Sequence, residues 1–155
     1  MAPPITIQEV GLESLEAALS LLERFFYEEG FSTPTHEMHA SLQAMITAPT
    51  SAVFLARRDT KVLGVATVNS SVGIEYGRSA ELEDLYVLPE ERGRGVASAL
   101  IEAVCAWCLD KGVKVVLVTV TPEGETRHAL LDYYQRHGFT NTKRIIMQRE
   151  ISARR

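Results

Sequence analysis

A short basic segment that contains two glycines has the clearest potential for chemistry in this sequence. Arg92-Gly93-Arg94-Gly95-Val96-Ala97 follows a strand-like stretch that stops at Pro89, and it precedes an uninterrupted helical pattern. The first N–H groups of a helix have no acceptor within the helix and point at whatever lies in front of it. Glycines let a ligand approach the backbone closely, and the arginines add positive charge. We therefore predict that backbone amides of residues 93–98 bind a diphosphate.

Other interpretations of this segment fit the residues less well. A plain surface loop would require neither the paired glycines nor the flanking arginines. A dinucleotide-binding fingerprint needs Gly or Ala where Ser98 stands, and an acidic residue at the end of the next strand, predicted at 114–120, which has none there. A P-loop needs Gly-Lys-Ser/Thr, which is absent. The remaining pattern is Arg/Gln-x-x-Gly-x-Gly/Ala, and Arg92, Gly95 and Ala97 match it.

Acidic residues in the preceding strand form the second cluster. Glu81, Glu83 and Asp84 alternate with β-forming and apolar residues in a strand that we predict to be central and covered. A carboxylate in such a strand requires a partner or a role, although in an exposed strand it would be ordinary. Strict alternation predicts that Glu81 and Glu83 share one face of the strand and that Asp84 lies on the other.

Two stretches resemble the GCN5-related N-acetyltransferases (GNAT), which use acyl-coenzyme A. They are LEDLYVLPEERGRGVASAL at 82–100 and DYYQRHGF at Asp132–Phe139, so the motifs cover the C-terminal half of the chain. The N-terminal half resembles the family only in its order of elements. One departure is Arg127, where many relatives carry asparagine. The resemblance implies an enzyme that transfers the acetyl group of acetyl-CoA, its co-substrate, directly to a primary amine, without a metal.

The resemblance also implies roles for single residues. Glu83 is the first choice as general base, because the Leu-Glu-Asp pattern is similar to that of diamine and polyamine acetyltransferases, with Glu81 and Asp84 as alternatives. Tyr134 is expected to protonate the leaving thiolate, and the backbone amide of Val87 to stabilise the carbonyl oxygen. The structural alternatives are an exposed acid for Glu83 and a packed aromatic for Tyr134.

The family's coenzyme binds in two places. Its diphosphate lies at the glycine segment, and its pantetheine arm pairs with the central strand as an added strand. The residues expected to bind the coenzyme are Leu85, Tyr86, Val87, Arg92, Gly93, Arg94, Gly95, Val96, Ala97, Ser98, Arg127 and Tyr134.

The acceptor site of the family is built from the link between the first two helices, the region before the central strand and the last strands. The residues that this chain supplies there are Tyr27, Glu28, Glu29, Phe31, Glu75, Tyr76, Glu81 and Glu123. The acids suit a small cationic amine such as a polyamine or an aminoglycoside, although an ordinary acidic surface would look the same. Acetylation of a protein lysine or N-terminus, and a non-catalytic domain that binds acyl-CoA, remain alternatives.

Apolar periodicity and turn signals predict one α/β (α+β) domain over residues 1–155. In the GNAT fold the central sheet is mixed but largely antiparallel, splays between its fourth and fifth strands and is flanked by helices. The predicted strands are 5–7, 51–57, 61–72, a central strand that stops at Pro89, 114–120, and a final hairpin within 139–151. The predicted helices are 12–30, 35–48, 97–111 and 126–137.

Composition restricts the class of protein. The chain has 155 residues, 46% of them hydrophobic, and a net charge of −4, which argues against nucleic-acid or anionic-membrane binding. No apolar run has transmembrane length and the first residues do not resemble a signal peptide, so we expect a cytoplasmic protein. Cys105 and Cys108 lie within a helix and are expected to be core residues, and His36 and His39 do not form a zinc motif. The resemblance is compatible with a homodimer.

Overall fold

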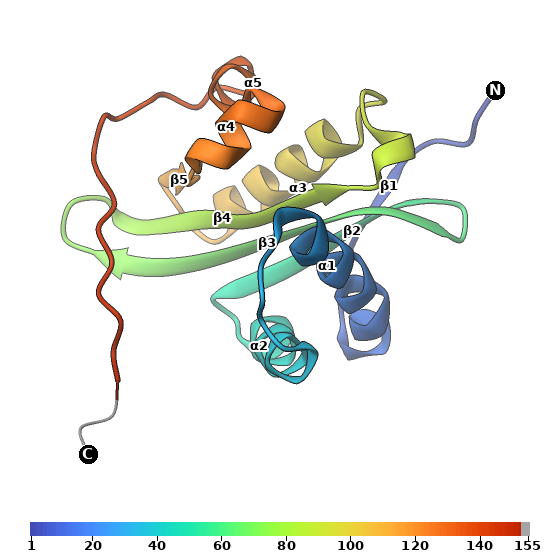
Figure 1. The fold of residues 1–155 in the computed structure, drawn as a ribbon, viewed down its shortest axis with the longest axis horizontal. Coiled ribbons are helices and arrows are strands. Elements are labelled where there is room, and N and C mark those ends of the chain that lie inside the picture. Colours follow the sequence, from blue (N-terminus) through green and yellow to red (C-terminus); the bar gives the residue numbers. More distant parts are fainter. Residues whose placement is uncertain (153–155) are drawn as a thin grey trace. The chain divides into compact units, whose positions relative to one another are not determined.

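The computed structural model describes residues 1–152, and the chain forms two compact units that divide after Thr119. Figure 1 shows the elements. The first unit contains β1 (Thr6–Glu9), the 3-10 turn η1 (Leu12–Ser14), α1 (Leu15–Glu29), α2 (Thr35–Thr47), β2 (Ser51–Arg58), β3 (Lys61–Gly73), β4 (Gly77–Val87), η2 (Pro89–Glu91), α3 (Val96–Asp110) and β5 (Val115–Leu117). The second unit contains α4 (Pro122–His128) and α5 (Leu130–Arg136). None of the helices in the described part is long and apolar enough to cross a membrane.

The sheet has five strands in the order β1-β2-β3-β4-β5. The first three pairings are antiparallel, and β4 pairs with β5 in parallel. The parallel pairing covers only Ser79–Glu81 of β4 and Val115–Leu117 of β5, so beyond Glu81 this edge of β4 has no neighbouring strand within the sheet. The predicted mixed α/β class, with strands four and five separating, is confirmed.

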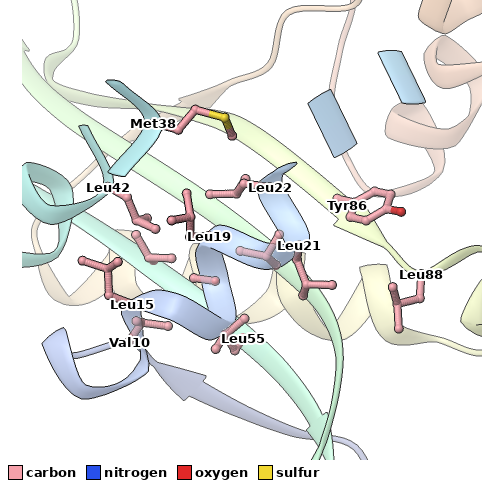
Figure 2. Packing of buried hydrophobic residues seen from close by; sticks show 13 residues of the cluster. Val10, Leu15, Leu19, Leu21, Leu22, Met38, Leu42, Leu55, Tyr86 and Leu88 are labelled. Carbon is pink, nitrogen blue, oxygen red and sulfur yellow. The ribbon is translucent and has the colours of Figure 1, made fainter. Parts of the chain in front are cut away.

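Helices cover both faces of this sheet (Figure 1). On one face, α1 and α2 pack against β2 and β3, and Figure 2 shows the apolar cluster between them. Leu19, Leu42 and Leu55 are each no more than 4% exposed there, and each such leucine contributes about 1.5–3 kcal/mol by leaving water. The helical spacing of the apolar residues in α1 therefore determines which side of that helix faces the sheet.

The opposite face is covered by α3, whose residues Val96, Leu100 and Val104 are at most 1% exposed. This helix lies close to the sheet because Gly64 of β3 has no side chain. A Cβ added at Gly64 would lie 2.8 Å from the carbonyl oxygen of Tyr86 and 3.2 Å from the side chains of Leu100 and Val96. The absence of a side chain at Gly64 thus determines how closely α3, the helix that follows the glycine segment, packs against the sheet.

We expect Gly64→Ala to destabilise the protein by about 1–3 kcal/mol, because the added methyl group overlaps a backbone oxygen that has little freedom to move. Urea unfolding followed by circular dichroism would measure the change. Gly73→Ala is the matched control, since a Cβ there meets nothing within 4 Å, and its effect should stay below about 0.5 kcal/mol. Equal effects in both variants would contradict this account of the packing.

Three predicted elements differ from the structure. The strand predicted at 114–120 extends only over Val115–Leu117, because its pairing with β4 ends where the two strands separate. Residues 139–152 contain no strand, so the predicted final hairpin is wrong. Turn contacts do form there, since Asn141 Oδ1 accepts from the Lys143 amide at 2.9 Å, but a β-forming sequence makes a strand only beside a partner.

The helix predicted at 126–137 is two helices, and the preceding loop is partly helical. Thr121 caps the first of them by accepting a hydrogen bond from the Gly124 amide at 3.0 Å, and Pro122 suits its first turn. The helix ends at Ala129, which adopts a left-handed conformation with φ 49°. The Glu125 carboxylate then accepts from the Leu131 amide at 2.7 Å and begins α5. Apolar periodicity does not detect such a break.

Candidate active site

The glycine segment forms a turn with two left-handed residues in front of α3. Gly93 has φ 75° and Gly95 has φ 85°, which favour glycine, and a Cβ at either position would point into open space. Gly95 is the N-cap and has no side chain with which to cap the helix, and the first turn of the helix contains no acidic residue. The first amides of α3, including those of Val96 and Ala97, therefore lack an acceptor within the helix. This geometry fits a bound anion at the end of a helix dipole.

The unpaired edge of β4 leads from this turn toward the acidic residues. The Leu88 amide donates to Leu63 across β3 at 2.9 Å, so antiparallel alternation directs the N–H and C=O of Val87 to the opposite edge. Leu85, two residues earlier, has the same orientation. Because β4 pairs with β5 no further than Glu81, residues 85–87 offer a strand edge to which an extended ligand arm can be added.

The acids of β4 lie at a β-bulge. Across β3, Thr67 pairs with Asp84. The next residue of β3, Val68, pairs with Leu82, so Glu83 is an extra residue without a partner in the ladder. Glu83 is exposed, and its bulged position separates it from the regular side-chain alternation of the strand.

The bulge changes which acids share a face. Glu81 pairs with Asn69, and Asp84 pairs with Thr67. Thr67 and Asn69 are two residues apart on β3 and lie on one face, so their partners Asp84 and Glu81 also share a face. The prediction that Asp84 lies opposite Glu81 is therefore wrong, because one extra residue shifts the alternation of the strand.

Glu83 and Asp84 both have raised pKa values. Partial desolvation and, after it, the negative charges of Asp84 and Glu81 raise the pKa of Glu83. Burial raises the pKa of Asp84 and the charge of Glu81 adds to this, while a hydrogen bond from Thr67 opposes it. Carboxyl groups with raised pKa values, such as those of Glu83 and Asp84, are candidates for proton transfer.

Two threonines that the sequence did not single out hold these acids. Thr67 is 1% exposed and donates from Oγ1 to Oδ2 of Asp84 at 2.5 Å. Thr119 donates to Oε1 of Glu81 at 3.1 Å, from the residue where the first unit ends. The available signal for Thr67 was a hydroxyl residue within the apolar run Val65–Val68, where a buried hydroxyl requires a partner.

The glycine turn is tied to the β2–β3 hairpin through Glu91, another residue that sequence reasoning missed. Its side chain is 5% exposed, and it accepts hydrogen bonds from Arg58 at 2.8 Å and from Lys61 at 3.1 Å. Those hydrogen bonds hold the pKa of Glu91 below its ordinary value. Arg94, predicted to bind the coenzyme, has a 62% exposed side chain 3.9 Å from the same carboxylate. Glu91 therefore anchors the start of the turn.

The predicted acceptor residues of the first unit lie in two places. Tyr27, Glu28 and Glu29 are in the last turn of α1, while Glu75 and Tyr76 are in the β3–β4 turn. Phe31, which follows α1, is 50% exposed and packs edge-on against Phe26 at 5.2 Å between ring centroids. Both carboxylate oxygens of Glu28 accept hydrogen bonds, one from Tyr86 and one from Arg92.

The remaining predicted residues belong to the second unit. Tyr134 lies in α5 and contacts Tyr133 and Phe139 edge-on, at 5.4 and 5.3 Å between ring centroids. Burial, and to a smaller extent Tyr133, raises the pKa of Tyr134 to about 12, so the phenol carries its proton at neutral pH. Arg127 is in the last turn of α4, and Glu123 is in its first turn.

The cysteines are core residues, as predicted. Cys108 is 2% exposed and Cys105 is partly buried. Burial is the main cause that raises the pKa of both thiols, to about 11 for Cys108, which disfavours a nucleophilic thiolate. Among residues 1–152, no group of three or more His, Cys, Asp or Glu side chains is arranged to hold a metal ion.

Comparisons with known proteins agree on one family. The model of the acetyltransferase (GNAT) family matches residues 15–139. The chain is 31% identical over 126 residues to the aminoglycoside N(6')-acetyltransferase type 1 of Salmonella typhimurium, covering 76% of this chain and 83% of that protein. It is 30% identical over 109 residues to the thialysine N-epsilon-acetyltransferase of Bos taurus, covering 70% of this chain and 60% of that protein.

The fold agrees with that of a solved aminoglycoside N-acetyltransferase in complex with CoA. The TM-score is 0.84 at 27% sequence identity, over 97% of each chain. The same enzyme has been solved with the bisubstrate analogue CoA-S-monomethyl-acetylneamine, and there the TM-score is 0.83 at 26% identity, over 96% of this chain and 99% of that one.

Proposed function

Because the chain belongs to the acetyltransferase (GNAT) family and is an acetyl-CoA-dependent N-acetyltransferase, we propose that its acceptor is a primary amine of a small cationic molecule of the aminoglycoside type. The observation that carries the proposal is the cluster of Glu81, Glu83 and Asp84 at the far end of the open β4 edge. Three carboxyl groups there attract a polycation and offer a proton acceptor. The relative at 31% identity is named for aminoglycosides, and the relative at 30% is named for thialysine, another small amine.

The coenzyme is proposed to bind along the path from the glycine turn to the β4 edge. The amides that begin α3 would hold the diphosphate, and the edge groups of Leu85 and Val87 would hydrogen-bond the pantetheine arm. The left-handed Gly93 and Gly95, with open space in place of a Cβ, support this fit. The Val87 amide, directed to that edge, would stabilise the negative charge on the thioester oxygen.

Acetyl transfer then requires proton transfers at the amine and at the departing thiolate. An aliphatic amine with a pKa of about 10.4 is almost fully protonated at neutral pH, so a base must remove its proton before attack. We assign this role to Glu83, acting directly or through water. The free amine attacks the thioester carbonyl and the C–N bond forms. The C–S bond then breaks, and the nitrogen loses its remaining excess proton to solvent. Tyr134 would give its proton to the departing thiolate, and its raised pKa keeps it protonated until then.

A thiol-release assay with an amine panel tests the proposal. The panel contains sisomicin and neamine as aminoglycosides, thialysine, spermidine and a lysine-containing peptide, each with acetyl-CoA as donor. We expect the highest kcat/KM with an aminoglycoside. The highest value with the peptide would refute the substrate class and leave the reaction type intact. The proposed substrate class would also be refuted if no amine on the panel raised the rate of thiol release above the rate measured without an acceptor.

The carboxyl cluster of β4 predicts that a substitution at Asp84 shifts the pH profile of kcat/KM. Glu83 must be ionised to accept a proton, so kcat/KM falls as the pH drops through its pKa. The Asp84 charge is one cause of the raised pKa of Glu83. We therefore expect Asp84→Asn to move the acidic limb of the profile to lower pH. Asp110→Asn, at the end of α3, is the control and should leave the limb in place. A shift to higher pH in Asp84→Asn would contradict the coupling.

A further inference from the structure

Three side chains from separate elements meet where the C-terminal end of α1 reaches β4. Tyr86 donates from its hydroxyl to Oε1 of Glu28 at 2.6 Å. Arg92 donates from Nη2 to Oε2 of the same carboxylate at 3.0 Å. The guanidinium also lies over the Tyr86 ring, 5.6 Å from its centroid. Glu28 therefore has both oxygens committed to partners within the protein.

Packing of the Tyr86 ring in the apolar core positions its hydroxyl for the hydrogen bond to Glu28. Tyr86 is 4% exposed and belongs to the cluster of Figure 2, where its hydroxyl lies at the edge, and the ring stacks on Phe25 at 5.5 Å between centroids. Burial and then the hydrogen bond to Glu28 raise the pKa of Tyr86 to about 12. Burial alone would raise the pKa of Glu28, but the hydrogen bonds from Tyr86 and Arg92 and the Arg92 charge hold it below its ordinary value. The triad is thus a neutral phenol and an ion pair.

Arg92 also reaches the strand edge at which the coenzyme is proposed to bind. Its Nε donates to the carbonyl oxygen of Val87 at 3.0 Å. That carbonyl points to the unpaired edge of β4, since the Val87 pair with Gly64 is of the type without cross-strand hydrogen bonds. One planar guanidinium therefore joins the Glu28 carboxylate to the main chain between the strand and the glycine turn.

We infer that Glu28 is a positioning residue for coenzyme binding and that its carboxylate does not bind the acceptor amine. Through Arg92, Glu28 fixes the Val87 carbonyl and the path of residues 88–92, and so presents the amides of the glycine turn in their binding geometry. The Arg92 side chain links Glu28 to the Val87 carbonyl, and it is not a diphosphate ligand. The inference rests on the proposed function, because it assumes that acetyl-CoA occupies the β4 edge and the turn.

A positioning role and an acceptor-binding role of Glu28 predict different effects on the KM of the amine and on the Kd of acetyl-CoA. If Glu28 bound the acceptor, Glu28→Gln would raise the KM of the amine and leave the affinity for acetyl-CoA unchanged. If it positions Arg92, the glutamine carries no charge to pair with the guanidinium and has one oxygen for the two donors, Tyr86 and Arg92, so the turn is held less firmly and must be ordered on binding. The cost then appears in the Kd of acetyl-CoA.

Calorimetry with acetyl-CoA alone, and initial rates with sisomicin at saturating acetyl-CoA, measure both quantities in the full chain. We expect Glu28→Gln to raise the Kd of acetyl-CoA at least about tenfold and to change the KM of sisomicin less than about twofold. Tyr86→Phe keeps the ring contacts and removes one donor, so a smaller increase in Kd is expected. Arg92→Lys should match Glu28→Gln, because an ammonium group cannot reach both partners in the same geometry. Glu23→Gln, an exposed position earlier on α1, is the control.

The outcomes distinguish this inference from the proposed function. Unchanged Kd in Glu28→Gln and Arg92→Lys, both folded by circular dichroism, would overturn the inference while acetyl-CoA binding by the wild type upholds the function. An increase in the KM of sisomicin as large as the increase in Kd would also overturn it. If Glu28→Gln fails to fold, an unchanged Kd of acetyl-CoA in Arg92→Lys is enough to overturn the inference. No binding of acetyl-CoA by the wild type would refute the proposed function itself.

Discussion

Replacing Glu83 with glutamine is expected to lower kcat/KM with acetyl-CoA and a small amine by about 10²–10⁴-fold, the usual contribution of a positioned general base. Glutamine keeps the size and polarity of the side chain and cannot accept the ammonium proton. The loss should shrink as the pH rises toward the pKa of the amine, because a larger fraction of the acceptor is then already unprotonated. Steady-state rates at several pH values would measure both effects.

Glu90→Gln is the matched control, since Glu90 is an exposed glutamate just beyond the same strand, in η2. Its kcat/KM should remain within about twofold of the wild type. Full activity in Glu83→Gln would remove Glu83 as the base and transfer the role to Glu81 or Asp84, which share a face of β4. A loss that stays constant with pH would indicate that Glu83 holds the substrate without taking its proton.

The second large effect is expected at the glycine turn. Gly95→Ala should raise the Kd of acetyl-CoA by about 10- to 100-fold, because a side chain disfavours φ 85° and the turn must relax away from the geometry that presents its amides. Calorimetry with acetyl-CoA measures this directly. The amides that begin α3 are the part of the protein most directly proposed to bind the diphosphate, so their displacement affects binding before any chemistry.

Gly112→Ala controls for backbone strain. Gly112 follows the other end of α3, is also left-handed with φ 73°, and a Cβ there meets nothing within 4 Å. The two substitutions carry a similar conformational cost of about 1–2 kcal/mol in stability, and only the change at Gly95 should weaken acetyl-CoA binding. Equal Kd values for both variants would contradict a role of the turn in binding.

The sequence alone determined the fold class, the family resemblance and the location of the glycine turn. These depend on local physics: strand and helix periodicity, the stop at Pro89, and the need for glycine at left-handed positions before a helix. Such features are carried by residues close together in the chain. Helical spacing is local in the same way, and Leu100 and Val104, four residues apart in α3, are both buried.

Only the tertiary structure decided which acids share a face of β4. The bulge at Glu83 arises from the register with β3, and strict alternation within β4 had placed Asp84 on the wrong face. The pairing of Glu28 with Tyr86 and Arg92 joins residues 58 and 64 positions apart, and no local pattern encodes it. Long-range register and side-chain partners depend on how several elements pack at once, so the sequence named most of the candidate residues, and the packing distinguishes the acids proposed to transfer the proton from the one proposed to position Arg92.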